Sequence, residues 1–122
     1  MKPSESAGEG QPESPKLLHA VFISHSSDDS SAADGVCTAL EAAGIHCWVA
    51  PRDVLAGRPY SGQITEAIRR AEILLLVLSQ ASNRSKQVLR EVERAAHFKV
   101  DLLAFKIEPV EPLDDLAYFL RG

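Results

Sequence analysis

The sequence has little of what membrane-spanning, secreted or nucleic-acid-binding proteins depend on. Its 122 residues include two cysteines and one tryptophan, aromatic residues make up 6%, and the formal net charge is −4. A chain this mildly acidic offers no basic footprint for nucleic acid or for an anionic membrane surface. No apolar run approaches the roughly 20 residues of a membrane span, and the longest, residues 73–78, has the length of a strand. We therefore expect neither nucleic-acid binding nor membrane insertion.

The beginning of the chain lacks the apolar stretch of a signal peptide and is rich in Ser, Glu, Gly and Pro. This composition predicts a disordered leader over residues 1–16 and one domain over residues 17–122. Cys37 and Cys47 are too few for a disulfide framework, so we expect them to be core thiols of a cytoplasmic protein. The histidines have no spacing suited to a metal, and neither a metal site nor a cofactor is expected.

Apolar and polar segments alternate along the rest of the chain as strands and helices do. Residues 73–78 (ILLLVL) are apolar on both faces, as a strand covered by helices on both sides must be. An S-x-x-D pattern at Ser31 predicts a capped helix start, and Gly44 predicts the end of that helix. Strands are expected at residues 17–24, 45–49, 73–78 and 100–107, and helices at 31–43, 64–71, 86–98 and 113–120.

This alternation, with short connections, predicts a parallel sheet flanked by helices, a doubly wound α/β fold. In such folds, ligands bind beyond the carboxyl ends of the strands, near the point where the strand order reverses. The loops at residues 24–30, 50–60 and 79–86 belong to that edge of the sheet. We therefore expect a functional site among these three loops.

Several common sites are missing from these loops. The segment after the first strand, SHSSDD, has no glycine, which argues against a dinucleotide fingerprint, and neither a P-loop nor a G-x-S-x-G elbow occurs. Asp28 and Asp29 imitate the acidic pair of a phosphoacceptor receiver domain, but Ser79 stands where a receiver needs an aspartate. The two aspartates also fit charges at a helix start, which the helix dipole favours.

Three motifs, in the correct order, resemble Toll/interleukin-1 receptor (TIR) domains. FISHSSDD is similar to the family's box-one signature, and ILLLVLSQASNRSKQVLREVERA to its third strand and the following helix. CWVAPRDVLAG resembles the BB loop, particularly that of bacterial members. The resemblance covers about residues 19–120. It implies a flavodoxin-like three-layer sandwich whose parallel sheet has the strand order 2-1-3-4-5.

The TIR resemblance also implies two kinds of function. Some members are non-catalytic modules for protein–protein interaction, whereas others cleave the nicotinamide–ribose bond of NAD⁺ and depend on self-assembly. The cleaving members need a glutamate on the helix after the third strand, four residues after a frequent tryptophan. Matching VLREVERA places that glutamate at Glu91 and the tryptophan position at Gln87. Helical periodicity alone leaves Glu91 and Glu93 nearly equivalent.

One carboxylate suits this reaction, because nicotinamide leaves as a neutral molecule while the ribose becomes oxocarbenium-like. The resemblance thus implies an NAD⁺ glycohydrolase or cyclase in a defence or stress-signalling pathway, such as antiphage defence. NAD⁺ is then the substrate, and other TIR domains are the partners. The alternative for Glu91 is a solvated helix glutamate paired with Arg90 or Arg94.

Further candidates for substrate binding lie mainly where the predicted strands end. Hydroxyl and imidazole groups at the end of the first strand could line a cleft. Trp48 is expected either to stack on a ring of the ligand or to lie in the core. The residues expected to contact substrate are Ser24, His25, Ser26, Trp48, Ser79 and Gln87, and Asn83 is a weaker candidate.

The BB-like loop, which connects the second strand to the second helix, supplies the expected assembly residues. By the resemblance, Pro51, Arg52, Asp53 and Gly57 gate the site or contact a neighbouring domain. The alternative is a proline-anchored turn with a solvated Arg52–Asp53 ion pair.

Two features depart from the family pattern. Gln87 replaces the frequent tryptophan, which removes a stacking surface but leaves an amide for hydrogen bonding. LAYFL is followed only by Arg121 and Gly122, where family members continue through a final helix. The last strand and helix are thus expected to be incomplete. An absent last helix would leave one face of the sheet uncovered, which predicts marginal stability or cover by another subunit.

Overall fold

The fold is a four-stranded parallel sheet with helices on both faces. The computed structural model describes residues 19–121, so the leader predicted for residues 1–16 lies outside the described residues. The strands follow one another across the sheet in the order β2-β1-β3-β4. This confirms the doubly wound class and agrees with the expected order as far as its fourth strand; no fifth strand occurs in residues 19–121. The strands are β1 (His19–Ser24), β2 (Cys47–Val49), β3 (Ala71–Leu78) and β4 (Asp101–Lys106).

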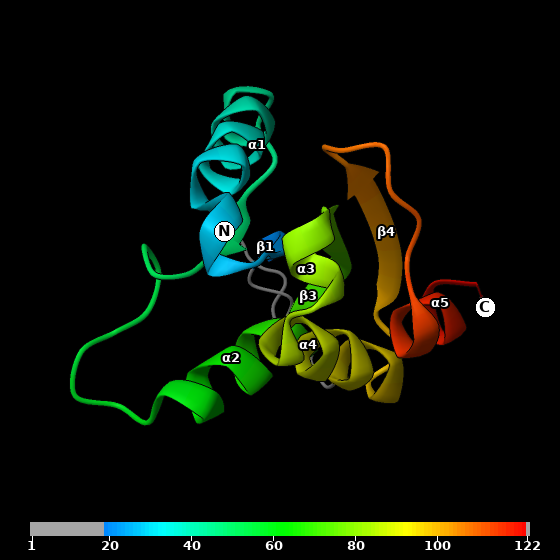
Figure 1. Cartoon of the computed structure of the whole chain (residues 1–122). Helices are drawn as coiled ribbons and strands as arrows, with labels where there is room; N and C mark the ends of the chain where they lie inside the picture. The colour runs from blue at the N-terminus through cyan, green and yellow to red at the C-terminus, as the bar shows by residue number, and fades with distance from the viewer. Residues whose placement is uncertain (1–18, 122) are drawn as a thin grey trace, which may run out of the picture.

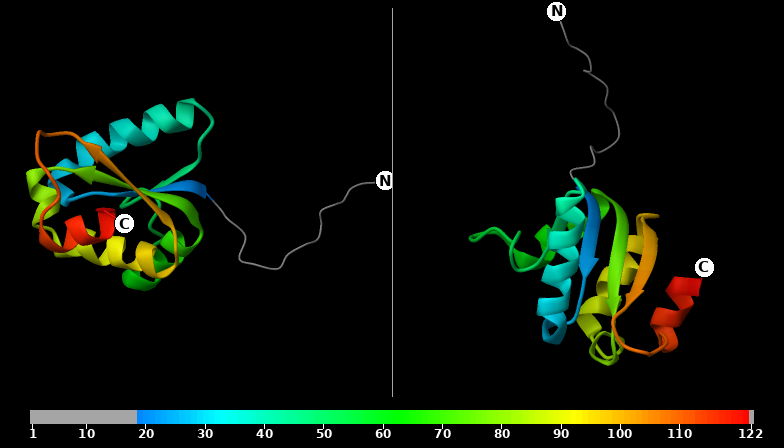
Figure 2. Two further views of the ribbon diagram at one scale, coloured as in Figure 1. Left: turned by 90° about the vertical axis from the view of Figure 1, so that its right-hand side faces the viewer. Right: turned by 90° about the horizontal axis from the view of Figure 1, so that it is seen from above.

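The helices are divided unequally between the two faces (Figure 1). One face carries α1 (Ser30–Ala42), and the opposite face carries three others, as Figure 2 shows from two directions. Those three are α2 (Tyr60–Arg69), α4 (Lys86–His97) and α5 (Asp114–Arg121). Two short helical turns, η2 (Ser27–Asp29) and α3 (Gln80–Asn83), follow the ends of β1 and β3. No helix in the described range is long and apolar enough to cross a membrane.

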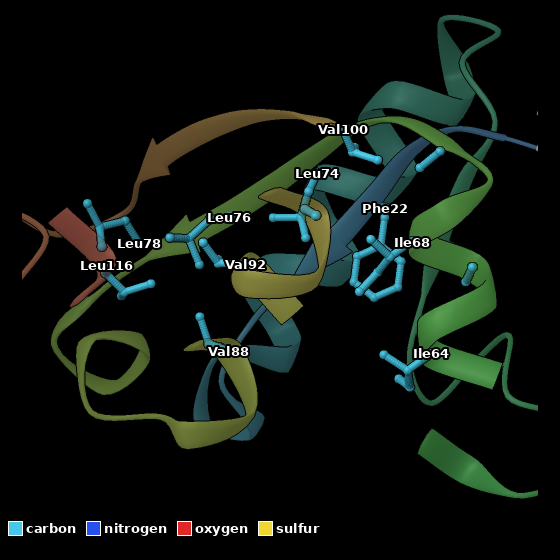
Figure 3. Packing of buried hydrophobic residues seen from close by; sticks show 13 residues of the cluster. Phe22, Ile64, Ile68, Leu74, Leu76, Leu78, Val88, Val92, Val100 and Leu116 are labelled. Atoms are coloured by element: carbon cyan, nitrogen blue, oxygen red, sulfur yellow. The ribbon is translucent and has the colours of Figure 1, made fainter. Parts of the chain in front are cut away.

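The central strand β3 supplies side chains to a core on each face. Leu74, Leu76 and Leu78 point toward α2, α4 and α5, where they join the larger cluster drawn in Figure 3. Leu75 and Val77 belong to the smaller cluster under α1. Because a strand places alternate side chains on opposite faces, this run is apolar throughout, as the sequence predicts.

The edges of several elements differ from the expected ones. α1 begins at Ser30 and not at Ser31, because the η2 turn runs directly into it. Ser26 caps η2, its hydroxyl accepting from the Asp28 amide, and Asp29 precedes α1 without a side-chain cap bond. The expected loop at residues 79–86 contains α3, which begins with a reciprocal hydrogen-bonded cap between Ser79 and Ser82. Gly44 ends α1 as predicted, with φ of +86°.

The face of β4 on the α1 side is uncovered. Leu103 and Phe105 pair in register with Leu75 and Val77, whose side chains are buried under α1. However, Leu103 is 52% exposed and Phe105 47% exposed. Within the described residues, this face of β4 is therefore an uncovered apolar surface.

Candidate active site

The site is organised around Glu91 on α4. Ser85 caps this helix, and its side chain accepts a hydrogen bond from the Val88 amide at 3.1 Å. Val88, Val92 and Ala95 form the buried stripe of the helix. Glu91 flanks that stripe at the end facing β1, and only 6% of it is exposed.

Two uncharged donors hold the Glu91 carboxylate. The Ser24 hydroxyl donates to Oε1 at 2.6 Å, and Nε2 of Gln87 donates to Oε2 at 2.7 Å. Arg94, considered above as an ion-pair partner, donates instead to Oγ1 of Thr65 at 2.8 Å. Glu93 is exposed, which separates it from Glu91 where periodicity could not. Glu91 is therefore a buried carboxylate, and the expectation of a solvated one is wrong.

Burial raises the pKa of Glu91 above its ordinary value of 4.5, because a charge loses solvation when it leaves water. The hydrogen bonds from Ser24 and Gln87, and the nearby His25, act in the opposite direction. A carboxylic acid with a raised pKa at a cavity wall is typical of a functional group. A cation entering the cavity would favour the ionised form.

We call the space in front of this carboxylate the Glu91 cavity. It has a volume of about 270 Å³ and lies between the end of β1, the start of the BB-like loop and α4. His25 links two of these walls, since its Nδ1 lies 2.8 Å from the Ser26 carbonyl oxygen and its Nε2 lies 3.0 Å from that of Ala50. The lining of the Glu91 cavity includes the expected His25, Ser26, Pro51, Gln87 and Glu91.

Other expected contacts lie elsewhere. Trp48 stacks on Phe22, with ring centroids 5.1 Å apart, and borders a separate pocket of about 530 Å³ beneath the BB-like loop. Ser79 is fully buried and donates to Oδ2 of Asp29 at 2.5 Å. Asn83 binds the backbone of residues 111 and 113. None of these three residues is in the lining of the Glu91 cavity.

The BB-like loop occupies residues 50–59, because α2 begins at Tyr60. Arg52 pairs with Asp53 at 2.9 Å, as the turn interpretation expected, and Oδ2 of Asp53 accepts from the Val49 amide at 2.9 Å. Gly57 has φ of +83°, a conformation that side chains with a Cβ rarely adopt. The loop is thus a hydrogen-bonded turn whose first proline, Pro51, borders the Glu91 cavity.

Sequence reasoning missed a polar cluster beside this loop. The Arg52 guanidinium forms two hydrogen bonds to Glu41, from Nη1 to Oε1 at 2.9 Å and from Nη2 to Oε2 at 3.0 Å. Arg52 Nη1 also lies 3.2 Å from the sulfur of Cys37. Cys37 and Cys47 are buried free thiols, as expected. The spacing of Cys37 and Glu41, one helical turn apart, was a signal that could have suggested the cluster.

Sequence reasoning also missed Tyr60 and Ser85, which line the Glu91 cavity. Tyr60 is the first residue of α2 and is 50% exposed. Ser85 is the cap of α4. Both stand at helix starts within the loops at residues 50–60 and 79–86 where the site was expected, and this position was the signal available in the sequence.

In this α/β domain the cavity beside the buried Glu91 carboxylate lies at the carboxyl edge of the sheet, where doubly wound folds bind their ligands. The family model described as TIR domain matches residues 21–120. The chain belongs to the TIR domain family. A comparison with curated proteins gives no significant match.

Solved structures agree with this assignment. The TIR domain of the Toll-related receptor TRR-2 from Hydra magnipapillata is 21% identical, with a TM-score of 0.73, over 85% of this chain and 79% of that one. A metazoan TIR-STING receptor from C. gigas is 30% identical, with a TM-score of 0.73, over 92% of this chain and 38% of the receptor chain. The TIR domains of the activated Roq1 resistosome are 19% identical, with a TM-score of 0.68, over 84% of this chain and 69% of that one. The likenesses at 21% and 19% identity show the fold alone.

Proposed function

We propose that this TIR domain cleaves NAD⁺ at the nicotinamide–ribose bond, with Glu91 as the catalytic carboxylate. The observation that carries the proposal is the Glu91 carboxylate itself, which is buried, hydrogen-bonded on both oxygens and part of the wall of a cavity. Its position also matches the essential glutamate of the NAD⁺-cleaving TIR domains that the sequence resembles.

The reaction needs a negative charge close to the ribose. When the glycosidic C–N bond breaks, its electron pair leaves with nicotinamide, which departs neutral, and the ribose takes up positive charge. An ionised Glu91 in a poorly solvated cavity stabilises that charge more strongly than a carboxylate in water would. Water then adds to the ribose with release of a proton, giving ADP-ribose; attack by a group of the substrate itself gives a cyclic product.

The size of the Glu91 cavity supports binding of one end of the dinucleotide. Its volume of about 270 Å³ is at the lower limit for small-molecule sites, which start near 300 Å³. The nicotinamide and its ribose fit such a volume, while the adenine half would extend beyond it. This agrees with an activity that depends on self-assembly, since a neighbouring TIR domain could supply the remaining contacts.

The BB-like loop offers a physical link between assembly and the cavity. Pro51 borders the cavity, and the Ala50 carbonyl oxygen contacts the His25 ring. A neighbouring domain that moves this loop would therefore change the cavity wall. We propose that Pro51, Arg52, Asp53 and Gly57 act in this way, that NAD⁺ and other TIR domains are the partners, and that the protein works in the cytoplasm.

The biological setting is proposed from the relatives. Two of the similar structures are of receptors, and the third is of a resistosome that recognises a pathogen effector. We propose a defence or stress-signalling pathway on this basis, antiphage defence being one example.

The experiment is chromatography of NAD⁺ incubated with concentrated protein and a molecular crowder. Wild type should release nicotinamide, and Glu91→Gln should not. Glu93→Gln is the matched control, because it makes the same change two residues away on an exposed position of α4. Equal release by wild type and Glu91→Gln would contradict the role of Glu91. If folded, self-associating wild type released no nicotinamide, this would contradict the proposed NAD⁺-cleaving activity.

The second candidate function is a non-catalytic module for TIR–TIR assembly. Gln87 favours it, because its amide occupies one carboxylate oxygen of Glu91 where many cleaving members have a tryptophan. The two functions differ in their response to substitution. A module should assemble normally as Glu91→Ala without turnover in any form, whereas in the enzyme changes at Arg52 or Gly57 should reduce assembly and turnover together.

A further inference from the structure

We infer that Cys37, Glu41 and Cys47 form a binding site for a thiophilic divalent metal ion such as Zn²⁺, which replaces the guanidinium of Arg52. This site is independent of the Glu91 cavity, and none of its residues lines that cavity. We call the four residues the Arg52 cluster.

The donor atoms are already close together. The two sulfurs and one carboxylate oxygen of Glu41 all lie within 4.8 Å of one another. In a tetrahedral zinc site with Zn–S bonds of about 2.3 Å, two sulfur ligands are about 3.8 Å apart. The donors therefore need to approach by about 1 Å or less. Side-chain rotation can supply this, because Glu41 is on the same helix as Cys37, one turn later.

The cluster already binds a cation. The Arg52 guanidinium reaches Cys37 Sγ at 3.2 Å, both oxygens of Glu41, and the Cys47 carbonyl oxygen at 2.9 Å. Cys37 Sγ and the Glu41 carboxylate thus face the end of the Arg52 side chain, and the Cys47 sulfur, which now donates to the Ile45 carbonyl oxygen, lies within 4.8 Å of both. A metal ion bound by the two sulfurs and Glu41 would take Cys37 and Glu41 from the guanidinium, so the metal and the guanidinium exclude each other.

The guanidinium of Arg52 can be exchanged for a metal ion because both cysteines can bind the metal as thiolates. Binding forms two metal–sulfur bonds and one metal–oxygen bond, the two thiol protons pass to solvent, and the guanidinium leaves with its charge. Water can complete the coordination. Two sulfur donors select zinc, or a similar soft ion, over magnesium or calcium, which prefer oxygen ligands.

A path to the site exists beside Arg52. Both cysteines are buried, but the Arg52 side chain is 45% exposed and that of Glu41 is 32% exposed. Removal of the guanidinium from the cluster therefore opens it to solvent. The same removal releases Arg52 from α1 and β2, which loosens the BB-like loop. Metal binding should therefore weaken the anchoring of this loop, and firm anchoring of the loop by Arg52 should weaken metal binding.

The experiment is a titration of the reduced, metal-free full chain with Co²⁺, a zinc substitute that gives a thiolate-to-cobalt absorption band. The sequence has no cysteines besides Cys37 and Cys47, so this band reports on these two alone. Wild type should bind one Co²⁺ per chain, and Zn²⁺ should displace it. Cys37→Ser and Cys47→Ser should lose the band, and Glu41→Gln should weaken binding.

Arg52→Gln keeps all three ligands and gives the sharpest test. It removes the competing cation, so Co²⁺ should bind about two- to fivefold more tightly than to wild type. Arg58→Gln, which removes a charge from the same loop outside the cluster, should leave the affinity unchanged. A structural role of Arg52 alone would not tighten metal binding. Amide exchange over residues 50–57 should increase when Zn²⁺ binds wild type and should already be high in Arg52→Gln.

Two results would overturn the proposal. One is the absence of a thiolate band in both wild type and Arg52→Gln. The other is a band that Arg52→Gln weakens, because the guanidinium would then support the metal and not compete with it.

Discussion

The Ser24 hydroxyl donates to Oε1 of Glu91 across 2.6 Å, joining two residues that lie 67 positions apart in the sequence. Ser24 is the last residue of β1, and Glu91 lies in the second turn of α4. Both are buried. The carboxylate is therefore oriented by the end of a strand as well as by Gln87 of its own helix.

Replacing this serine should change the pH dependence of activity. Ser24→Ala removes a hydrogen bond that lowers the pKa of Glu91, so the pKa should rise further. The proposed reaction needs ionised Glu91. The acidic limb of the pH–rate profile for NAD⁺ cleavage should therefore move to higher pH. The lost buried hydrogen bond should also cost about 1 kcal/mol of stability. Rates measured across pH, together with thermal unfolding, check both effects.

Ser79→Ala is the matched control for Ser24→Ala. Ser79 directly follows β3 and is fully buried, but its hydroxyl donates to Asp29 and accepts from the Ser82 amide as the cap of α3. A loss of at least about 1 kcal/mol is expected, because two hydrogen bonds are removed, with no movement of the acidic limb. An equal shift in both variants would contradict a specific effect of Ser24 on Glu91.

Glu91→Gln should stabilise the protein at neutral pH. The folded-state pKa of Glu91 is raised above 4.5, so ionisation costs more in the folded than in the unfolded chain. The wild type consequently loses stability as pH rises from about 4.5 through the folded pKa. Glutamine does not ionise, and its amide can still accept from Gln87 and donate to the Ser24 oxygen.

Urea unfolding at several pH values measures this effect. The variant should be more stable than wild type at pH 7 by about 1 kcal/mol, the usual scale for relieving a strained functional site. The difference should disappear below pH 4.5, the ordinary pKa of the side chain. A variant less stable than wild type at pH 7 would contradict the predicted cost of burying the charge.

The central strand and the end of α1 were predictable from the sequence because their signals are local. The apolar run at residues 73–78 and the stop at Gly44 each depend on the chain immediately around them, and both are present. The start of α1 was misplaced because the η2 turn, which Ser26 caps, runs directly into the helix and leaves Asp29 at its N-cap position. The sequence has no distinctive pattern for that turn.

The site was only partly predictable, because its contacts join distant segments. Periodicity could not separate Glu91 from Glu93, since the α4 stripe can be drawn with either at its edge. The contact with Ser24 across 67 residues distinguishes them. The Arg52–Glu41 pair was missed for the same reason: the partners are 11 positions apart, with a helix end, a turn and a strand between them.

The Arg52–Glu41 pair should contribute to stability only while Glu41 is ionised. The hydrogen bonds from Arg52 lower the pKa of Glu41 from 4.5 to about 2. The contribution is therefore complete above pH 4.5 and is lost as pH falls through about 2. Glu41→Gln should melt below wild type at pH 7, by no more than a few degrees because the pair is at the surface. Melting curves of the two proteins should converge near pH 2.

The uncovered face of β4 should promote association. Leu103 and Phe105 are exposed on the same side of the strand. Phe105→Thr replaces an exposed aromatic ring with a residue that also favours strands, so stability should change by about 0.5 kcal/mol or less. The expected result in sedimentation experiments is weaker association at high concentration. Lys106→Thr, one residue along on the opposite side of β4, is the control and should leave association unchanged.

Tyr60 should supply the aromatic contact that Gln87 cannot. It lines the Glu91 cavity and also contributes, with Gln87 and Glu91, to the neighbouring pocket between α2 and α4. Its ring is half exposed, so stacking on nicotinamide or adenine needs little rearrangement. Stacking of a base on an aromatic ring is worth about 1–3 kcal/mol, so Tyr60→Ala should raise KM for NAD⁺ roughly fivefold or more. Tyr60→Phe keeps the ring and should keep KM. An increase of KM in both variants would assign the effect to the hydroxyl group, and no increase in Tyr60→Ala would exclude stacking on this residue.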